Sequence, residues 1–193
     1  MTLNDRSTPL SLLETRRSGR PREMTAPGPS EAELAHILAI AARTPDHGKL
    51  FPWRFVTVAP DQRGALADLL VEALPESDPD AGPAHVAKTI EFAHQAPTLV
   101  VLIAAPVADH KIPQWEQQLS VGAAGMNLLL AAHAIGFVAG WITGWAAYSP
   151  RVTAAFCGPG ERIAGFLFIG SPGLPLEERI RPDLAAVVRR WIP

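Results

Sequence analysis

The chain has 193 residues, of which 48% are hydrophobic and 19% charged, as in a single globular domain and unlike a disordered chain. Its formal net charge is −2 and its pI is about 6.3, so it lacks the basic field that attracts nucleic acid. Cys157 is the single cysteine, which excludes an intrachain disulfide and a CxxC redox or zinc motif.

The apolar segments predict neither a leader peptide nor a membrane span. Residues 1–18 mix charges with leucines and contain no unbroken apolar stretch, which argues against a signal peptide. The stretch 98–107 is too short to cross a bilayer, and the stretch 122–140, which contains Asn127 and His133, favours a buried helix. Together with the single cysteine, these features predict a cytoplasmic protein.

In chain order, the first half alternates helix signals with loops. Thr8-Pro9 combines a capping oxygen with an early helical proline, which predicts a helix that ends near residues 16–18. A polar, proline-rich link follows, and the capping box Ser30-Glu31-Ala32-Glu33 then predicts a helix through Ala41. The remaining predictions are a loop over 43–53, a strand over 55–59 and a helix that Asp61 caps and that runs to residue 73.

The second half begins with a predicted surface break at 75–83 and a helix over 84–96. Residues 98–104 form a continuous apolar run typical of a strand that is buried on both faces. Pro113 begins a long helix that Gly136 ends; its inner part is apolar on nearly every side, as in a core or an interface. The last predictions are a strand over 137–143, a short helix from Ser149-Pro150, a strand over 163–170 and a helix over 184–191. This alternation predicts one α+β domain over 1–193.

Two basic segments are candidate anion sites. If the chain turns after the first helix, Arg16, Ser18 and Arg20 can converge, and guanidinium groups with a hydroxyl are good phosphate ligands. The alternative is a solvated basic helix end that favours the helix dipole. Arg179 and Arg181 are two residues apart, so in an extended segment they face the same way and can approach one phosphate. Solvated surface arginines are the alternative there.

Two further segments have the residue types of a site for a flat ligand. The loop Arg43–Trp53 combines turn formers with His47, Lys49 and a tryptophan, and loops beside core helices often carry binding groups. In Gly140–Gly144, at a strand end, glycines permit close approach and backbone amides can donate to the ligand. The alternative for the loop is a histidine whose hydrogen bonds are satisfied locally. The alternative for the strand end is a core tryptophan between two glycine turns that close the strand.

Other motifs for catalysis or nucleotide binding do not occur in the sequence. It contains neither GxGxxG after a strand nor GxxxxGK[ST]. It also contains no HExxH motif, and its six histidines are scattered without metal-ligand spacing, so no metal is predicted. A GxSxG nucleophile elbow is likewise missing.

In their order and spacing, these segments resemble the nitroreductase family. Arg-Arg-Ser at 16–18 after a helix, a second helix and the Pro-Asp-His loop that ends in Pro52-Trp53 are similar to the start of small bacterial nitroreductases. Residues 113–117, 140–143 and 165–170 are similar to one compact subgroup. The resemblance covers residues 10–180. It implies a nitroreductase-like sandwich with a central, mostly antiparallel sheet flanked by helices, in an intertwined homodimer whose core the long apolar helix forms.

The resemblance further implies one FMN in each of two clefts between the subunits. Arg16, Arg17 and Ser18 would hold the phosphate and ribityl chain. The side chains expected to help at the phosphate are Arg20, Arg179 and Arg181.

The remaining implied contacts are with the flavin ring. Arg43 and His47 match positions that contact flavin in the compact subgroup, His47 from the partner subunit. Arg43 and Lys49 are the candidate donors that would stabilise charge at the pyrimidine end of the reduced ring. Backbone contacts along the isoalloxazine are implied for Trp141, Ile142 and Thr143. The subgroup often has a polar or basic residue where Ile142 stands, so only the backbone contact is carried over there.

The implied activity is that of an oxidoreductase. FMN would accept hydride from NAD(P)H and then reduce a nitroaromatic or quinone-like acceptor in a ping-pong scheme, so no catalytic side chain is predicted. Three alternatives stay open: a flavin or enone reductase on the same fold, a flavin-binding storage or sensing protein without turnover, and a structural α+β protein that binds no flavin.

Overall fold

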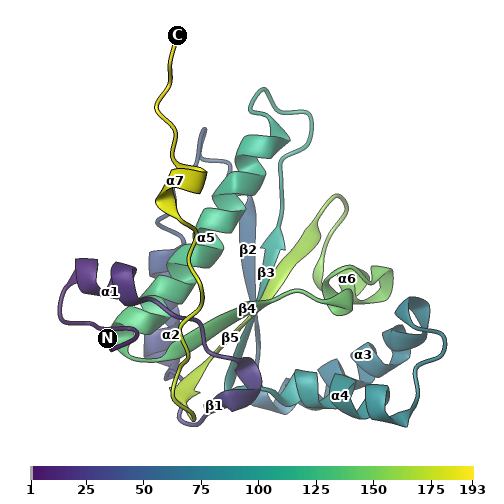
Figure 1. Ribbon diagram of the computed structural model, residues 1–193. Coiled ribbons are helices and arrows are strands. Elements are labelled where there is room, and N and C mark those ends of the chain that lie inside the picture. Colours follow the sequence, from purple (N-terminus) through teal and green to yellow (C-terminus); the bar gives the residue numbers. More distant parts are fainter. Residues whose placement is uncertain (1) are drawn as a thin grey trace.

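The computed structural model describes residues 2–193 and shows a sheet with helices on both of its faces (Figure 1). The predicted α+β class and the antiparallel sheet are confirmed. The helices are α1 Pro9–Thr15, α2 Glu31–Ala41, α3 Arg63–Ser77, α4 Pro83–His94, α5 Gln114–Ile135, α6 Pro150–Phe156 and α7 Leu184–Val187. The strands are β1 Met24–Thr25, β2 Trp53–Val58, β3 Thr98–Ala104, β4 Val138–Ile142 and β5 Arg162–Pro172.

The sheet is organised around β5, its longest strand. β5 pairs with β3 over residues 162–169 and with β4 over 166–170, and its last two residues pair with β1. β2 completes the sheet beside β3. Every pair is antiparallel. This connectivity brings segments from both ends of the chain to the end of β5.

The sheet is buried on both faces, which explains the continuous apolar run in β3. Because side chains alternate along a strand, Leu99 and Val101 pack against α3, α4 and α6, whereas Val100 and Leu102 pack against α2 and α5. All four side chains are fully buried. Two apolar layers therefore hold the sheet, and α5 forms the long rod in front of it in Figure 1.

One side of α5 packs on the sheet and the other is open. Val121, Ala124 and Leu128 are buried, whereas Trp115 and Leu119 are 67% and 55% exposed. Gly136 ends the helix in the left-handed conformation, with φ 114°, which glycine adopts without strain. By length and composition alone α5 could cross a membrane, but half of its most apolar window is buried against the rest of the protein, as predicted for a core helix.

The side chain of Trp141 lies in a slot formed by two glycines. A Cβ on Gly125 of α5 or on Gly165 of β5 would overlap the indole ring. The ring nitrogen Nε1 donates a hydrogen bond to the Ala164 carbonyl oxygen over 3.0 Å. The ring therefore points into the protein and joins β4, β5 and α5, which leaves the backbone of β4 to form the surface.

The local predictions are wrong in four places. Helix α3 continues through Pro75 to Ser77 instead of breaking; the proline lies in the last turn, where few helical bonds remain to be lost. Asp61 lies in a 3-10 turn and caps no helix. β1 falls in the predicted link, where no residue pattern marks its two residues. The terminal helix has four residues, because the exposed segment 177–193 offers it no packing surface.

The Trp141 slot predicts that Gly125→Ala destabilises the protein by about 1–3 kcal/mol, as overpacking of a filled core does. Gly64→Ala is the matched control, because a Cβ at Gly64 in α3 meets no atom within 4 Å; it should be neutral or stabilising by up to about 1 kcal/mol. Urea unfolding at one fixed protein concentration measures both. Equal midpoints for Gly125→Ala and the natural protein would contradict the slot.

Candidate functional site

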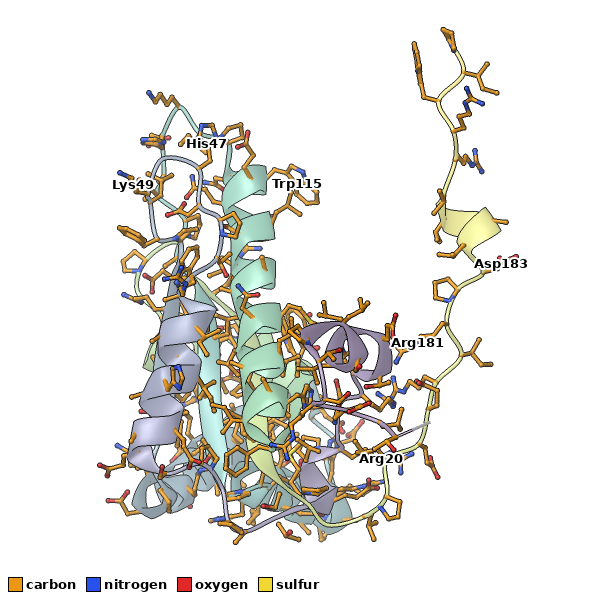
Figure 2. All side chains as sticks on the ribbon, turned by 90° about the vertical axis from the view of Figure 1, so that its left-hand side faces the viewer. Arg20, His47, Lys49, Trp115, Arg181 and Asp183 are labelled. Carbon is orange, nitrogen blue, oxygen red and sulfur yellow. The ribbon has the colours of Figure 1, made fainter. Side chains whose placement is uncertain are left out.

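The two predicted basic segments meet in space although they lie about 160 residues apart in the chain. Arg17 Nε donates a hydrogen bond to the Glu177 carbonyl oxygen over 2.6 Å, and Arg181 Nη2 donates to the Arg16 carbonyl oxygen over 3.2 Å. Figure 2 shows Arg20 and Arg181 on the same side of the molecule. The two basic segments are therefore in direct contact in the folded chain.

The gathered guanidinium groups repel one another. Burial is the main cause that lowers the pKa of Arg16, and the charge of Arg181 lowers it further. The pKa of Arg17 is also lowered by burial and then by Arg179 and Arg181. Glu178 opposes these shifts in both cases. An anion bound among these side chains would relieve the repulsion, because opposite charge stabilises the protonated form.

Local hydrogen bonds hold this arginine loop in place. The side chain of Asn4 accepts from the Arg17 amide over 2.7 Å and donates to the Arg17 carbonyl oxygen over 3.0 Å. Arg16 Nη1 donates to Ser18 Oγ over 3.2 Å. The Gly19 amide donates to the Ala139 carbonyl oxygen over 3.2 Å, and a Cβ on Gly140 would come within 2.6 Å of the Gly19 oxygen. Glycine at 140 thus lets the loop lie directly against β4.

A cleft of about 330 Å³ opens between the arginine loop and β4. It brings together six of the predicted site residues: Arg17, Ser18, Arg20, Trp141, Ile142 and Arg179. Arg20 is held there by ion pairs to Glu23 and Glu177 of 2.9 and 3.3 Å. Trp141 lines the cleft although its ring nitrogen is hydrogen-bonded to the Ala164 carbonyl oxygen in the slot.

Sequence reasoning missed two residues of this cleft, Arg22 and Gln95. Arg22 lies in a 3-10 turn after the basic segment, and its proximity to Arg20 in the sequence was an available signal. Gln95 directly follows α4 and reaches the cleft only through the way α4 packs. No local pattern marks it.

A second cavity of about 220 Å³ lies next to the cleft and shares Ile142 with it. Thr143, the next predicted site residue, lies in its wall. The remaining wall comes from α3, α4 and the turn after β4: Leu70, His85, Lys88, Thr89, Phe92, Gly144, Trp145 and Ala146. The predicted ring-contacting segment 141–143 therefore passes from one cavity into the other.

The other predicted group, Arg43, His47 and Lys49, lies elsewhere. Figure 2 shows His47 and Lys49 beside the first turns of α5, far from Arg20 and Arg181. His47 Nδ1 contacts Glu116 Oε2 of α5 at 2.7 Å, and Ser120 Oγ of α5 donates to the Pro45 carbonyl oxygen. None of the three lines the cleft. A single chain therefore assembles only part of the predicted site.

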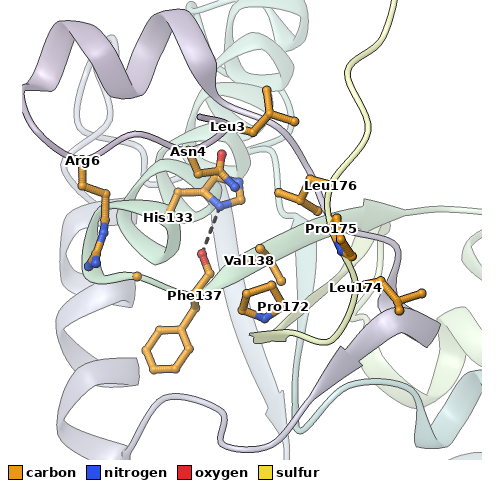
Figure 3. Close-up of a pocket in the computed structure, with 11 residues that line it drawn as sticks. Leu3, Asn4, Arg6, His133, Phe137, Val138, Pro172, Leu174, Pro175 and Leu176 are labelled. Carbon is orange, nitrogen blue, oxygen red and sulfur yellow. Dashed lines mark hydrogen bonds between the residues drawn. The ribbon is translucent and has the colours of Figure 1, made fainter. Parts of the chain in front are cut away.

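A third cavity of about 360 Å³ lies behind the arginine loop and contains none of the predicted residues (Figure 3). Its polar feature is His133, whose Nδ1 lies 3.2 Å from the Phe137 carbonyl oxygen, while its buried Nε2 has no partner in the described part of the chain. Burial lowers the pKa of His133 to about 4, and the charge of Arg16 acts in the same direction. The imidazole is therefore neutral at pH 7.

No group of three or more His, Cys, Asp or Glu side chains is arranged to hold a metal ion within residues 2–193.

Fold and cleft together define an α+β protein whose basic cleft beside a glycine-containing strand fits a flat, anionic ligand. The sequence matches the family described as "Nitroreductase family" over residues 13–171, and the chain belongs to that family of oxidoreductases. It is 34% identical over 176 residues to "Putative NAD(P)H nitroreductase YdjA" of Escherichia coli strain K12, covering 90% of this chain and 94% of that one. A protein of similar description from Haemophilus influenzae is 37% identical over 172 residues, 88% and 91% of the two chains.

Solved structures show the same fold. A nitroreductase-like family protein from Bacillus cereus superposes with a TM-score of 0.80 at 20% identity and covers 96% of each chain. The FMN and NADPH-dependent nitroreductase NfnB of Sphigopyxis sp. strain HMH gives a TM-score of 0.71 at 20% identity, over 93% of this chain and 96% of that one. The predicted nitroreductase-like sandwich is thereby confirmed.

The buried His133 predicts a pH-dependent stability. Its pKa falls from 6.5 to about 4 on folding, so the unfolded chain binds the proton more readily, and stability present above pH 6.5 is lost as the pH falls to 4. At about 1.4 kcal/mol per unit, this group contributes a loss of about 3 kcal/mol.

The check is urea unfolding at several pH values with the variant His133→Asn. Its side-chain amide can still donate to the Phe137 oxygen but does not titrate. The variant should lose less stability than the natural protein between pH 6.5 and 4. Parallel stability curves for the two proteins would show that His133 is not buried in its neutral form.

Proposed function

We propose that this oxidoreductase depends on FMN and uses NAD(P)H to reduce nitroaromatic or quinone-like acceptors by a ping-pong mechanism, in the cytoplasm. The observation that carries the proposal is the cleft in which Arg17, Ser18 and Arg179 face the end of β4. The relatives named as NAD(P)H nitroreductases support the hydride donor, and NfnB, described as FMN and NADPH-dependent, supports the cofactor.

The residues of the cleft fit the phosphate of FMN, together with Arg16 and Arg181, which do not line the cleft but contact Ser18 and the Arg16 carbonyl oxygen respectively. Arg16, Arg17 and Ser18 supply guanidinium and hydroxyl donors, and charge-assisted bonds to phosphate oxygens are stronger than neutral ones. Further cations come from the returning chain at Arg179 and Arg181, with Arg20 at the rim. Burial is the main cause that lowers the pKa values of Arg16 and Arg17, and a phosphate dianion would offset the arginine–arginine repulsion that lowers them further.

The backbone of residues 140–143 fits the flat ring system. Gly140 lets the arginine loop lie directly against β4, the Trp141 side chain is turned inward, and Ile142 and Thr143 continue the wall into the second cavity. Backbone amides here are candidate donors to ring atoms. When bound, FMN supplies the redox chemistry, taking hydride from NAD(P)H and passing reducing equivalents to the acceptor. The protein positions the ring and excludes water, and we assign no side chain as a general acid.

We further propose that the active form is an intertwined homodimer. The open side of α5 exposes Trp115 and Leu119, and the arm formed by residues 177–193 extends away from the body of the chain (Figures 1 and 2). Ile180, Trp191 and Ile192 of this arm are more than 80% exposed. Apolar surfaces of this extent are typical of interfaces. In the dimer, Arg43, His47 and Lys49 of the partner chain would approach the ring, with Arg43 and Lys49 at its pyrimidine end.

Two alternatives use the same cleft. The chain would be a storage or sensing protein if NADH fails to bleach the bound flavin under argon. A flavin or enone reductase would bleach but leave nitroaromatics and quinones unreduced. The nitroreductase relatives favour turnover with electron-poor acceptors.

Titration with FMN, followed by the visible spectrum, tests the phosphate assignment. Arg17→Gln should weaken FMN binding about 10- to 150-fold, because hydrogen bonds from charged donors contribute about 1.5–3 kcal/mol. Riboflavin has no phosphate, so its affinity should be the same in both proteins. Arg151→Gln is the matched control, because Arg151 pairs with Glu76 away from the cleft. A natural protein that takes up neither flavin would refute the proposed function.

Subunit complementation tests the two-chain site. A chain carrying Arg17→Gln is paired with a chain carrying Arg43→Gln and His47→Ala, and the heterodimer is isolated through two different tags. Because a two-fold dimer has two equivalent sites, one of them should combine natural residues from both chains and restore about half of the FMN bound by the natural dimer. If all these residues serve one site in one chain, the heterodimer should bind as weakly as the two parent variants.

A further inference from the structure

We propose that the cavity beside Ile142 binds the ring of the electron acceptor and that Lys88 selects acceptors with a carboxylate group. The proposal rests on the proposed function, because the cavity adjoins the cleft assigned to FMN. Nitrobenzoate-type aromatic acids are thus the preferred substrate class.

The floor of the cavity fits an aromatic ring. Leu70 and Ala146 are almost completely buried, and Phe92 and Trp145 add aromatic surface. Phe92 itself is fixed by edge-to-face contacts with Phe166 and Phe168, with ring centroids 5.4 and 5.3 Å apart. Such a wall binds flat apolar groups through burial and edge-to-face contacts.

The position of the cavity suits an acceptor. Ile142 lies in the walls of both the cleft and the cavity, and Thr143 and Gly144 follow it directly. A ring placed in the cavity would therefore lie beside the segment that we assign to the isoalloxazine. The cavity also opens between α4 and the turn after β4, away from the arginine loop that we assign to the phosphate.

The charge at the cavity comes from two side chains on one face of α4. His85 and Lys88 are three residues apart, which places them side by side on a helix. The His85 Nδ1 atom already has a partner in Asp78 Oδ2, at 2.8 Å. Lys88 is exposed and has no ion-pair partner among the described side chains. Among the described residues, Lys88 is therefore the cation at this apolar wall that is free to bind a ligand. A carboxylate group on the bound ring would form an ion pair with it.

Steady-state kinetics with two acceptors of similar size tests this assignment: 4-nitrobenzoate and the neutral 4-nitrobenzyl alcohol. The first two-electron step consumes one NAD(P)H and one proton, converts the nitro group into a nitroso group, and releases NAD(P)+ and water. Lys88→Gln should lower the ratio of kcat/KM for the acid to that for the alcohol by about fivefold, the size expected of a solvent-exposed ion pair. Lys88→Glu should lower the ratio further, and Lys88→Arg should keep it.

The control is Asp68→Asn, which changes the charge of the neighbouring helix α3 at an exposed residue outside the cavity wall, and should leave the ratio unchanged. An unchanged ratio in Lys88→Gln would overturn the proposal even if both acceptors are reduced. Calorimetric titration of the FMN-loaded protein with benzoate gives a readout without turnover. Benzoate binding that depends on Lys88, in a protein that reduces neither acceptor, would support the site and refute the proposed function.

Discussion

Repulsion among arginine side chains is the constraint from which the geometry of the cleft follows. After burial, which is the larger cause, the charge of Arg181 lowers the pKa of Arg16, and the charges of Arg179 and Arg181 lower that of Arg17. Such an arrangement opposes folding unless other groups hold it. Asn4 fixes the backbone at Arg17. Near the chain end, the carboxylates of Glu177 and Glu178 pair with Arg20 and Arg181 and balance part of the charge. If the cleft binds the FMN phosphate, as we propose, the ligand-free chain already holds the arginines in place, and the phosphate would relieve their repulsion on binding.

Three glycines, two in the sheet and one in α5, shape the second half of the cleft. Gly140 lets the arginine loop approach β4, while Gly125 and Gly165 receive the Trp141 ring. The two features are linked, because turning the indole ring inward leaves the backbone at 140–142 as the surface that meets a ligand. A tryptophan next to a binding cleft is easily taken for a stacking residue. Here its role is to tie α5, β4 and β5 together.

The sequence allowed the fold to be predicted where local physics decides it. The capping box at Ser30, the buried run of β3 and the glycine end of α5 appear as expected. The convergence of Arg16 with Arg181 was predictable only through the family resemblance, since nothing local joins segments 165 residues apart. Gln95 and the continuation of α3 through Pro75 were not predictable, because tertiary packing determines both. The roles of the twelve predicted site residues stay predictions.

The predicted site residues lie in two distant regions of one chain. This separation argues that two chains must assemble before the proposed site is complete. α5 has 22 residues and at about 1.5 Å per residue is about 33 Å long. The loop with His47 lies beside its first turns, and the arginine loop lies beside its other half (Figure 2). No side chain spans that distance. If two copies pack their open α5 faces together in antiparallel fashion, the two-fold axis places each His47 loop beside the partner's arginine loop, and the same apolar contact that forms the dimer completes both sites.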